Sequence, residues 1–550
     1  MGATHTVENQ STPFADVDLF ALNRPLRDAL AHHAPALDTS RLAALGRLAG
    51  SAEYQRHARL ANVHTPELRT HDRFGRRLDE VEFHPSYHAL MTAACEAGLH
   101  GTPWSAGAHA HLERAAGFML FTELEPSVLC PVSMTYAVTP ALRDNRAIAA
   151  EWGPKLAVRA YDPAFAPAAR KQAVTMGMGM TEKQGGSDVR ANSSRAVPDG
   201  EDGWGRRFLI TGHKWFMSAP MCDAFLVLAY SEGGLSCFFL PRWRPDGTLN
   251  AIRIQRLKDK LGNKANASSE VEFDAASAWL VGDEGRGVPQ ILAMGVMTRL
   301  DCALGTSGLM RHALAVAIAH CRERTAFGRR LADHAAMKNV LADLALESEA
   351  ATALALRLAR SMDAPPSDER EAALRRVLTP VAKFWICKRG SAFAQEAMEC
   401  LGGNGYVEEG GEGVMARIYR EMPVNSIWEG AGNIMALDLV RALRKGTAVA
   451  DALRDELADA RGAHRAFDAL AASLPDRIDA AVDEADARAL CRDVALAVQA
   501  ALLQRHSSPD VFAAFCESRF GGGAGGLGAF GMLPSGTPFD AILERALPRH

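Results

Sequence analysis

The sequence predicts a mainly helical α+β protein in which one small antiparallel β-domain separates two helical regions. Three observations support this class. Helical periodicity dominates residues 1–175, short β-branched and aromatic runs occupy 176–285, and helical periodicity returns over 286–446. A further Ala-rich helical region follows at 447–550. Because 550 residues exceed what one hydrophobic core usually supports, we expect three or four packed regions.

Each region has its own local signal. Segments such as SRLAALGRLAGSAEYQRHARLA predict the N-terminal helices, and the prolines of DPAFAPAARK mark a break before Lys171. The runs RFLITG, AFLVLAY and LSCFFLPR, separated by turn clusters such as PDGEDG, are typical of a small antiparallel barrel or sandwich. The segments RHALAVAIAHCRER and KNVLADLALESEAATALALRLARSM have one apolar face, as helices of a bundle do. FGGGAGGLGAFG, at 520–531, lacks the spacing of a phosphate loop and is typical of a flexible connection.

Composition restricts the partners. With a net charge of −4 and a pI near 6.5, no global field draws the chain to nucleic acid or membrane, so such a partner would need a local patch. No apolar run reaches the ~18 residues of a spanning helix, and MGATHTVENQST does not resemble a secretory signal. Met1–Gly2 with Thr6 fits the N-myristoylation pattern, although so short a pattern often arises by chance.

The cysteines and histidines do not predict a metal site. None of the ten cysteines forms a C-x-x-C pair, and several lie in apolar helical sequence. This usage is typical of buried, reduced thiols in a cytoplasmic protein. His109 and His111 point to different sides of a helix, so they do not form a ligand pair.

Residues 176–196, MGMGMTEKQGGSDVRANSSRA, carry groups suited to a bound ligand. They combine Thr181, the adjacent Gly185 and Gly186, and Ser187. Glycines let the backbone approach a ligand closely, and hydroxyls with free N–H groups suit phosphate or a polar ring edge. The alternative is that this sequence forms only a turn.

Four later segments also carry chemistry. In ITGHKWFMSAP, Trp215 and Phe216 should face opposite sides of a strand, so that one ring can cover a planar ligand while the other enters the core. Two further segments lie beside helix ends. An arginine and a phenylalanine, Arg324 and Phe327, occur in RERTAFGRRLADH, and several glycines occur in ECLGGNGYVEE. In YREMPVNSIWEGAGNIMALDL, Glu429 lies between an aromatic residue and a glycine, just before a new helix.

In this order and spacing, the five segments resemble the acyl-CoA dehydrogenase superfamily from about residue 80 to 446. LGNKANASSEVEFDAASAWLVGDEGRGV, at 261–288, resembles a sixth motif of that family. Within that family, the chain is similar to the DNA alkylation-response, AidB-like flavoprotein branch. The stretches that carry this similarity are MTEKQGGSDV, GHKWF, LSCFF, RLKDKLGN and REMPVNSIWEG. The extra C-terminal helical region fits that branch. The resemblance implies the acyl-CoA dehydrogenase fold.

The resemblance also implies an FAD cofactor between the β-domain and the second helical bundle. Thr181 would meet the polar edge of the flavin, and Phe216 its face. Arg324 and Phe327 would reach the FAD of a neighbouring subunit, which implies a homo-oligomer, commonly a tetramer in this family. The implied cofactor-binding residues are Met180, Thr181, Gly186, Ser187, Phe216, Met217, Ser218, Arg324, Phe327, Gly403, Ile427, Trp428, Gly430 and Asn433.

Glu429 stands at the position of the family's catalytic base. Removing a proton α to a thioester carbonyl needs a carboxylate within reach, desolvated enough to raise its pKa. The alternative is a helix N-terminal carboxylate that interacts with the helix dipole. Some relatives place the base one helix earlier, where this chain has Thr298 before Arg299. The chain departs from the family's pattern at Trp428, Ala431, Glu399 and Glu421, in place of Tyr, Thr, Gln and Asp.

The implied function has two main forms. One is an enzyme that desaturates acyl thioesters, and the other is a DNA-binding flavoprotein with vestigial dehydrogenase activity. A scaffold that keeps FAD for stability is a third form. Arg441, Arg444 and Lys445 share one helix face and are the candidate contacts to double-stranded DNA. The alternative is that these cations only offset the helix dipole before a C-cap at Gly446.

Overall fold

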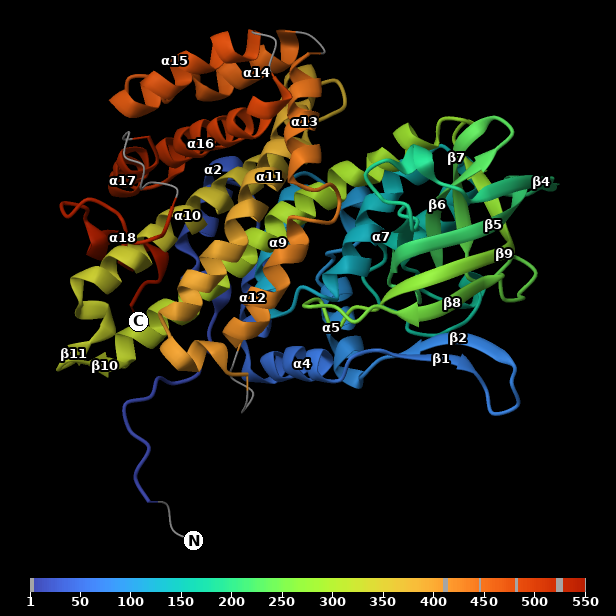
Figure 1. Cartoon of the computed structure of the whole chain (residues 1–550), viewed down its shortest axis with the longest axis horizontal. Helices are drawn as coiled ribbons and strands as arrows, with labels where there is room; N and C mark the ends of the chain where they lie inside the picture. Colours follow the sequence, from blue (N-terminus) through green and yellow to red (C-terminus); the bar gives the residue numbers. More distant parts are fainter. Residues whose placement is uncertain (1–3, 409–413, 445–446, 480–482, 521–527, 550) are drawn as a thin grey trace. The chain divides into compact units, whose positions relative to one another are not determined.

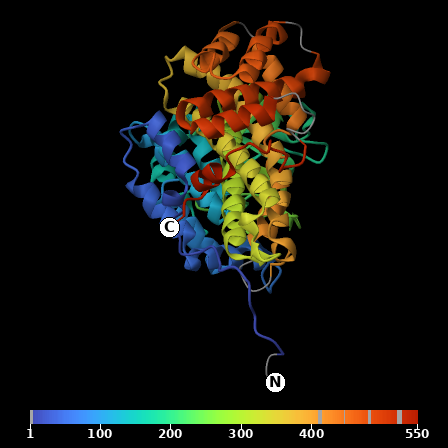
Figure 2. The ribbon, with the colours of Figure 1, turned by 90° about the vertical axis from the view of Figure 1, so that its left-hand side faces the viewer.

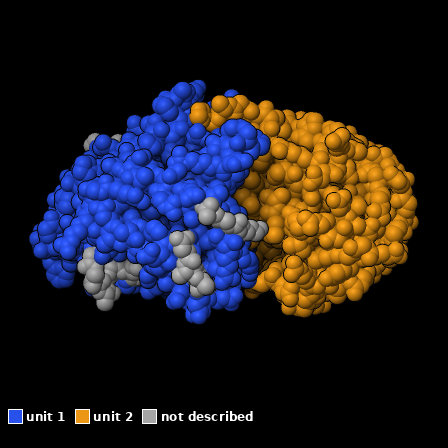
Figure 3. All heavy atoms as spheres, turned by 90° about the horizontal axis from the view of Figure 1, so that it is seen from above, with its two compact units in different colours: residues 1–52, 111–124, 302–550 blue, residues 53–110, 125–301 orange. Residues whose placement is uncertain are grey.

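The computed structural model of the chain describes residues 4–408, 414–444, 447–479, 483–520 and 528–549. The chain forms two compact units, coloured in Figure 3. Unit 1 contains residues 1–52, 111–124 and 302–550, and unit 2 contains residues 53–110 and 125–301. The boundary at residues 301 and 302 falls within the long helix α9 (Gly287–Glu323).

Unit 2 contains a seven-stranded sheet that closes on itself. Its strands are β3 (Met176–Gly179), β4 (Arg195–Asp202), β5 (Gly205–Ser218), β6 (Ala224–Ser231), β7 (Gly234–Pro241), β8 (Ile252–Leu257) and β9 (Ser268–Val281). Five of these strands pair in the order β4–β5–β9–β7–β6. Because β6 also pairs with β4, the five strands close into a barrel (Figure 1). Strands β3 and β8 extend from β6 and β9.

The barrel confirms the predicted β-domain, but it is not wholly antiparallel. Strand β3 pairs with β6 in parallel, and the bridge between Arg195 and Tyr230 that joins β4 to β6 is also parallel. The apolar core of the barrel explains why the sheet closes on itself. Phe208 of β5, Phe238 of β7 and Trp279 of β9 are almost completely buried in one hydrophobic cluster. The fold class is therefore the expected one, with a mixed rather than antiparallel sheet.

Unit 2 also contains helices and a hairpin. The helices are α4 (Ala52–Val63), α5 (Pro85–Glu96), α7 (Leu129–Leu142) and α8 (Arg146–Ala157), with the short 3-10 helices η1 (Thr102–Ser105), η2 (Ala168–Arg170) and η3 (Val189–Ala191). Helix α7 packs against β3, where Thr135 Oγ1 accepts a hydrogen bond from Met176 N at 3.0 Å.

The hairpin β1 (Glu67–His71) and β2 (Arg77–Glu82) corrects the helical prediction for residues 1–175. Its turn contains Gly75 at φ 81°, a conformation that favours glycine. The strands carry many charged residues, so they lack the β-branched and aromatic runs by which the sequence predicts strands.

Unit 1 is helical. Its helices are α1 (Leu19–Leu22), α2 (Arg24–His33), α3 (Ser40–Gly50), α6 (Ala110–Leu124), the second part of α9, α10 (Ala335–Arg360), α11 (Glu369–Glu399), α12 (Val414–Asn425), α13 (Gly432–Leu443), α14 (Thr447–Ala458), α15 (Arg465–Asp479), α16 (Ala487–His506), α17 (Pro509–Phe520) and α18 (Phe539–Ala546). It also contains β10 (Thr325–Ala326), β11 (Arg329–Arg330), η4 (Leu331–Asp333), η5 (Ser361–Asp363), η6 (Gly402–Tyr406) and η8 (Glu484–Asp486). Helices α10 and α11 lie at its centre, and α16 packs against both (Figure 2).

Buried ion pairs join the C-terminal helices to α10. Arg357 of α10 contacts Glu456 of α14 at 3.0 Å, and Arg519 of α17 contacts Asp343 of α10 at 2.7 Å. Buried charges are stable only when they are paired and hydrogen-bonded. These contacts specify where α14 and α17 pack against α10.

Helix α9 is long and apolar enough to cross a membrane by length and composition, and 89% of the qualifying window is buried inside the protein. The sequence does not show it as one apolar run, because polar residues such as Arg311 and His312 interrupt it. In this chain α9 has the burial of a core helix.

Candidate functional site

The segment after β3 forms a tight turn in unit 2. Glu182 and Gly185 form an isolated bridge, and Gly185 has φ 139°. A Cβ atom on Gly186 would lie 2.5 Å from Oγ1 of Thr181, so any larger residue there would displace that side chain. Thr181 is half-buried and Ser187 is exposed. Both residues are therefore accessible, and their role in binding a ligand stays a prediction.

The end of β5 differs from the prediction. A bulge in its pairing with β9 lies between Lys214 and Met217, so the regular alternation of side chains is broken there. Neither Trp215 nor Phe216 enters the core, and Phe216 is 50% exposed. The Nζ atom of Lys258 lies 3.4 Å from the ring centre of Trp215 and 4.6 Å from that of Phe216. The expected opposite orientation of the two rings is wrong, because the bulge brings both rings to one lysine.

The next two residues of β5 have different surroundings. The Met217 side chain is completely buried, so only its backbone is available to a cofactor, and its carbonyl accepts a hydrogen bond from Ser269 Oγ at 2.8 Å. Ser218 Oγ lies 3.2 Å from Ser268 Oγ. It remains half-buried, which leaves the Ser218 hydroxyl accessible.

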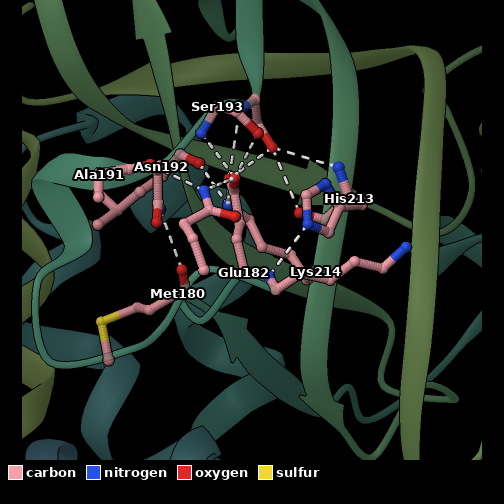
Figure 4. A network of polar contacts seen from close by, with 11 residues as sticks. Met180, Glu182, Ala191, Asn192, Ser193, His213 and Lys214 are labelled. Carbon is pink, nitrogen blue, oxygen red and sulfur yellow. Dashed lines mark hydrogen bonds and ion pairs between the residues drawn. The ribbon is translucent and has the colours of Figure 1, made fainter.

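A buried ion pair lies between these two segments, and sequence reasoning missed it. Lys214 Nζ contacts Glu182 Oε1 at 2.7 Å, and both side chains have no exposed surface (Figure 4). Burial opposes the charged carboxylate, but Lys214 and the serine donors outweigh it and lower the pKa of Glu182 to about 2. Both residues occur in the quoted motifs, MTEKQGGSDV and GHKWF, yet nothing in either motif shows that they pair.

In unit 1, Arg324 directly precedes a two-stranded hairpin made of β10 and β11, and Phe327 lies in the turn of that hairpin. Phe327 is 96% exposed and has φ 52°. The guanidinium of Arg324 donates a hydrogen bond to the carbonyl of Asn9, and Asn9 Oδ1 accepts from the backbone N–H of Thr325 at 2.8 Å. The exposed ring is available to a second chain, as the prediction requires.

The N-terminal segment also contacts η6, which contains Gly403. Asn404 donates a hydrogen bond to Gln10 at 3.1 Å. Thr12 donates two hydrogen bonds to the carboxylate of Glu323, at 2.7 and 2.8 Å. Residues 9–12 therefore join the end of α9, the hairpin and η6 within unit 1.

Glu429 lies in the turn between α12 and α13. It has φ 58°, and the following Gly430 has φ 113°. The carbonyl of Gly430 accepts a hydrogen bond from Nζ of Lys383 at 2.8 Å, and Lys383 is almost completely buried in α11. Helix α13 begins at Gly432 and has no acidic residue in its first turn. Glu429 therefore lies outside the first turn, which disfavours the helix-dipole alternative.

The neighbours of Glu429 differ in exposure. Ile427 is 64% exposed, whereas the indole N–H of Trp428 is buried without a hydrogen-bond partner in the described structure. Asn433, in the first turn of α13, is exposed. Thr298 belongs to unit 2, where its hydroxyl donates to the backbone carbonyl of Met294 at 3.4 Å.

The candidate DNA contacts lie at the end of α13. Arg441 and Arg444 are both exposed, and Arg444 is the C-cap residue of the helix. Lys445 lies outside the described residues. The last turn of α13 therefore carries cations that suit either a polyanion or the helix dipole.

Three family models match successive parts of the chain. Residues 9–163 match the adaptive response protein AidB N-terminal domain, residues 177–276 the acyl-CoA dehydrogenase middle domain, and residues 285–444 the acyl-CoA dehydrogenase C-terminal domain. The chain is also 46% identical to AidB of Escherichia coli over 519 residues, which cover 94% of each chain. The chain belongs to the acyl-CoA dehydrogenase family, in its AidB-like branch.

Other relatives extend this likeness. Acyl-CoA dehydrogenase family member 11 of Caenorhabditis elegans is 31% identical over 408 residues, covering 71% of this chain and 64% of that protein. The solved structure of C. elegans ACDH-11 in complex with C11-CoA has a TM-score of 0.83 at 26% identity, covering 94% of this chain and 93% of that chain. The Bd2924 apo-form has a TM-score of 0.82 at 29% identity, covering 91% and 99%. The AidB-like chain therefore shares its C-terminal helical region as well as its barrel with solved relatives.

Proposed function

We propose that this AidB-like chain binds FAD and acts as a flavin oxidoreductase of the acyl-CoA dehydrogenase type, with Glu429 as the base. The conformation of the Glu429 turn carries the proposal. A carboxylate kept for the helix dipole would lie in the first turn of α13, and Glu429 lies before it. A left-handed backbone at a residue other than glycine costs about 1 kcal/mol or more and is concentrated at functional sites.

The predicted FAD residues fit such a cofactor in each unit considered alone. In unit 2, the half-exposed ring of Phe216 offers an apolar face, and a side chain at Gly186 would displace Thr181. In unit 1, the buried indole N–H of Trp428 is a donor that a polar ligand atom would satisfy. The donors and the aromatic face suit a planar ring with a polar edge.

The proposed roles follow from this arrangement. FAD, when bound, supplies the acceptor for a hydride. Glu429 takes the α-proton of an acyl thioester, and its backbone N–H polarises the thioester carbonyl. Trp428 is larger than the family's usual tyrosine at this position, and we propose that it narrows the space for the acyl chain. The solved relative in complex with C11-CoA makes a medium-length acyl-CoA the first substrate to test.

DNA binding in the alkylation response is the second candidate function. The exposed Arg441 and Arg444, together with the similarity to AidB, favour it. We propose a cytoplasmic homotetramer, in which the exposed Phe327 contacts a neighbouring subunit. A tetramer would place several cationic helix ends on one particle and strengthen weak contacts to DNA.

The test is a visible spectrum of the purified protein, followed by anaerobic addition of acyl-CoAs of increasing chain length. We expect a yellow protein that releases flavin on denaturation and bleaches with at least one acyl-CoA. A colourless protein that gains no flavin absorbance with added FAD would contradict FAD binding. A yellow protein that no acyl-CoA bleaches would instead favour the DNA-binding function or a scaffold that keeps FAD for stability.

A further inference from the structure

Glu182 is the centre of a buried polar network in unit 2. Its Oε1 atom accepts from Lys214 Nζ and Ser194 Oγ, both at 2.7 Å. Its Oε2 atom accepts from the backbone N–H of Ser193 at 2.6 Å, and from Ser193 Oγ and Gln184 Nε2, both at 2.9 Å. Figure 4 shows these donors converging on the carboxylate from three segments of chain. The carboxylate is therefore fully hydrogen-bonded without water.

The network joins the two barrel segments that we propose to hold FAD. Glu182 follows Thr181 directly, and Lys214 lies two residues before Phe216. The backbone continues the connection, because the N–H of Trp215 donates to the carbonyl of Thr181 at 2.8 Å. The Nζ atom of Lys214 also donates to the carbonyl of Leu228 in β6 at 2.8 Å.

Stability alone is a poor explanation for this pair. The desolvation of two buried charges largely cancels their attraction, and a well-packed apolar pair is often at least as stable. Directed hydrogen bonds have a different effect, because they specify one relative position of the groups that they connect. Asn192 adds to this effect, since its Nδ2 donates to the carbonyl of Met180 at 3.0 Å.

We propose that Glu182 and Lys214 are a positioning pair, which holds the Thr181 turn and the Phe216 bulge in the relative position that FAD requires. This inference rests on the proposed function. Neither side chain has exposed surface, so neither touches the cofactor directly. Their removal should change the affinity for FAD and the spectrum of the bound flavin.

The experiment compares Glu182→Gln with a matched buried pair in the same unit. Lys171 and Asp223 lie 2.7 Å apart with 4% and 8% exposed side chains, so Asp223→Asn removes a similar charge pair at another place. FAD affinity is measured by titrating apoprotein with FAD, the flavin environment by visible absorbance and circular dichroism, and stability by the melting temperature of the apoprotein.

We expect both variants to lower the apoprotein melting temperature, and only Glu182→Gln to weaken FAD binding, by tenfold or more, with an altered visible dichroism. Lys214→Arg keeps the positive charge beside Glu182 and should retain most of the wild-type spectrum. If the lone Lys214 charge prevents Glu182→Gln from folding, the double variant Glu182→Gln with Lys214→Met removes both charges and replaces it in the comparison.

Two results would overturn the positioning role. One is an FAD affinity within twofold of wild type in folded Glu182→Gln, or in the double variant where it replaces Glu182→Gln. The other is an equal loss of affinity in Asp223→Asn. The failure of wild-type protein to bind FAD would instead contradict the proposed function, so the two failures are distinguishable.

Discussion

At the scale of single residues, Glu429 is the residue on which the proposed dehydrogenase activity depends. Glu429→Gln keeps the size and hydrogen bonding of the side chain and removes the proton acceptor. We expect the rate of acyl-CoA-dependent flavin bleaching to fall by about 10²–10⁴-fold or more, with FAD content unchanged. Stopped-flow absorbance of the flavin band measures this rate. Bleaching at the wild-type rate would assign the base to another residue.

Lys383 is a second residue whose role the structure predicts. Its Nζ atom holds the carbonyl of Gly430, next to Glu429. Lys383→Met should let the turn move and slow bleaching by roughly 10–100-fold, because small misplacements of a reacting group have effects of this size. Arg370→Met, which removes an exposed cation near the N-terminal end of the same helix, is the control. Equal rates in Lys383→Met and wild type would exclude this role.

At the scale of elements, the N-terminal segment supports the hairpin that carries Phe327. Asn9 has φ 54°, a conformation that asparagine tolerates better than most residues, and its side chain pairs with Thr325. We expect Asn9→Ala to weaken the subunit contact and lower FAD retention several-fold, whereas Glu8→Ala should not. Sedimentation velocity and the flavin-to-protein absorbance ratio measure both effects. An unchanged tetramer with full flavin content in Asn9→Ala would contradict the prediction.

Helix α13 carries the prediction about DNA. If its exposed end contacts duplex DNA, affinity should fall steeply with salt and depend little on sequence. Arg441→Ala with Arg444→Ala should flatten the salt dependence by about one unit for each contacting arginine. Arg73→Ala with Arg76→Ala removes two exposed cations from the β1–β2 turn as a control. Equal slopes for all three proteins, measured by fluorescence anisotropy, would remove α13 from DNA recognition.

At the scale of the whole molecule, acid should destabilise the fold through a histidine cluster in unit 1. The rings of His33 and His506 have centres 5.8 Å apart, and three of their four nitrogens are buried without a partner in the described structure. Burial, helped by neighbouring positive groups, lowers the pKa of His33 to about 2 and that of His506 to about 4. The charged and titratable groups that act on them are His32, Arg357, Arg360, Arg505, Arg545 and Asp28.

The direction of the effect follows from proton binding. Below pH 6.5 the unfolded chain protonates these histidines while the folded chain does not, so stability falls as the pH is lowered. The loss should reach roughly 1–2 kcal/mol per histidine at pH 5. Melting temperatures between pH 7.5 and 5 measure it, and His506→Leu should flatten the dependence relative to wild type. Parallel curves for the two proteins would contradict a contribution from this cluster.

The local pattern of the sequence was enough to predict the order of the main regions and the segments that carry chemistry, although it missed the charged β1–β2 hairpin within the N-terminal region. Helical and strand periods repeat over a few residues, so the barrel region and the long helices of the bundle could be read directly. The position of Glu429 before a helix, and the glycines beside Thr181, are also features of short stretches of chain. Family resemblance then assigned the expected roles of these residues.

The tertiary structure decided the features that depend on residues far apart in the chain. Glu182 and Lys214 are 32 residues apart, and only the packing of the barrel shows that they are paired and fully buried. The bulge that brings Trp215 and Phe216 to Lys258 depends on the register of β9, and the position of α17 depends on Arg519 reaching Asp343. A residue pattern records local conformational preference, whereas the burial and pairing of charges depend on which distant segments meet.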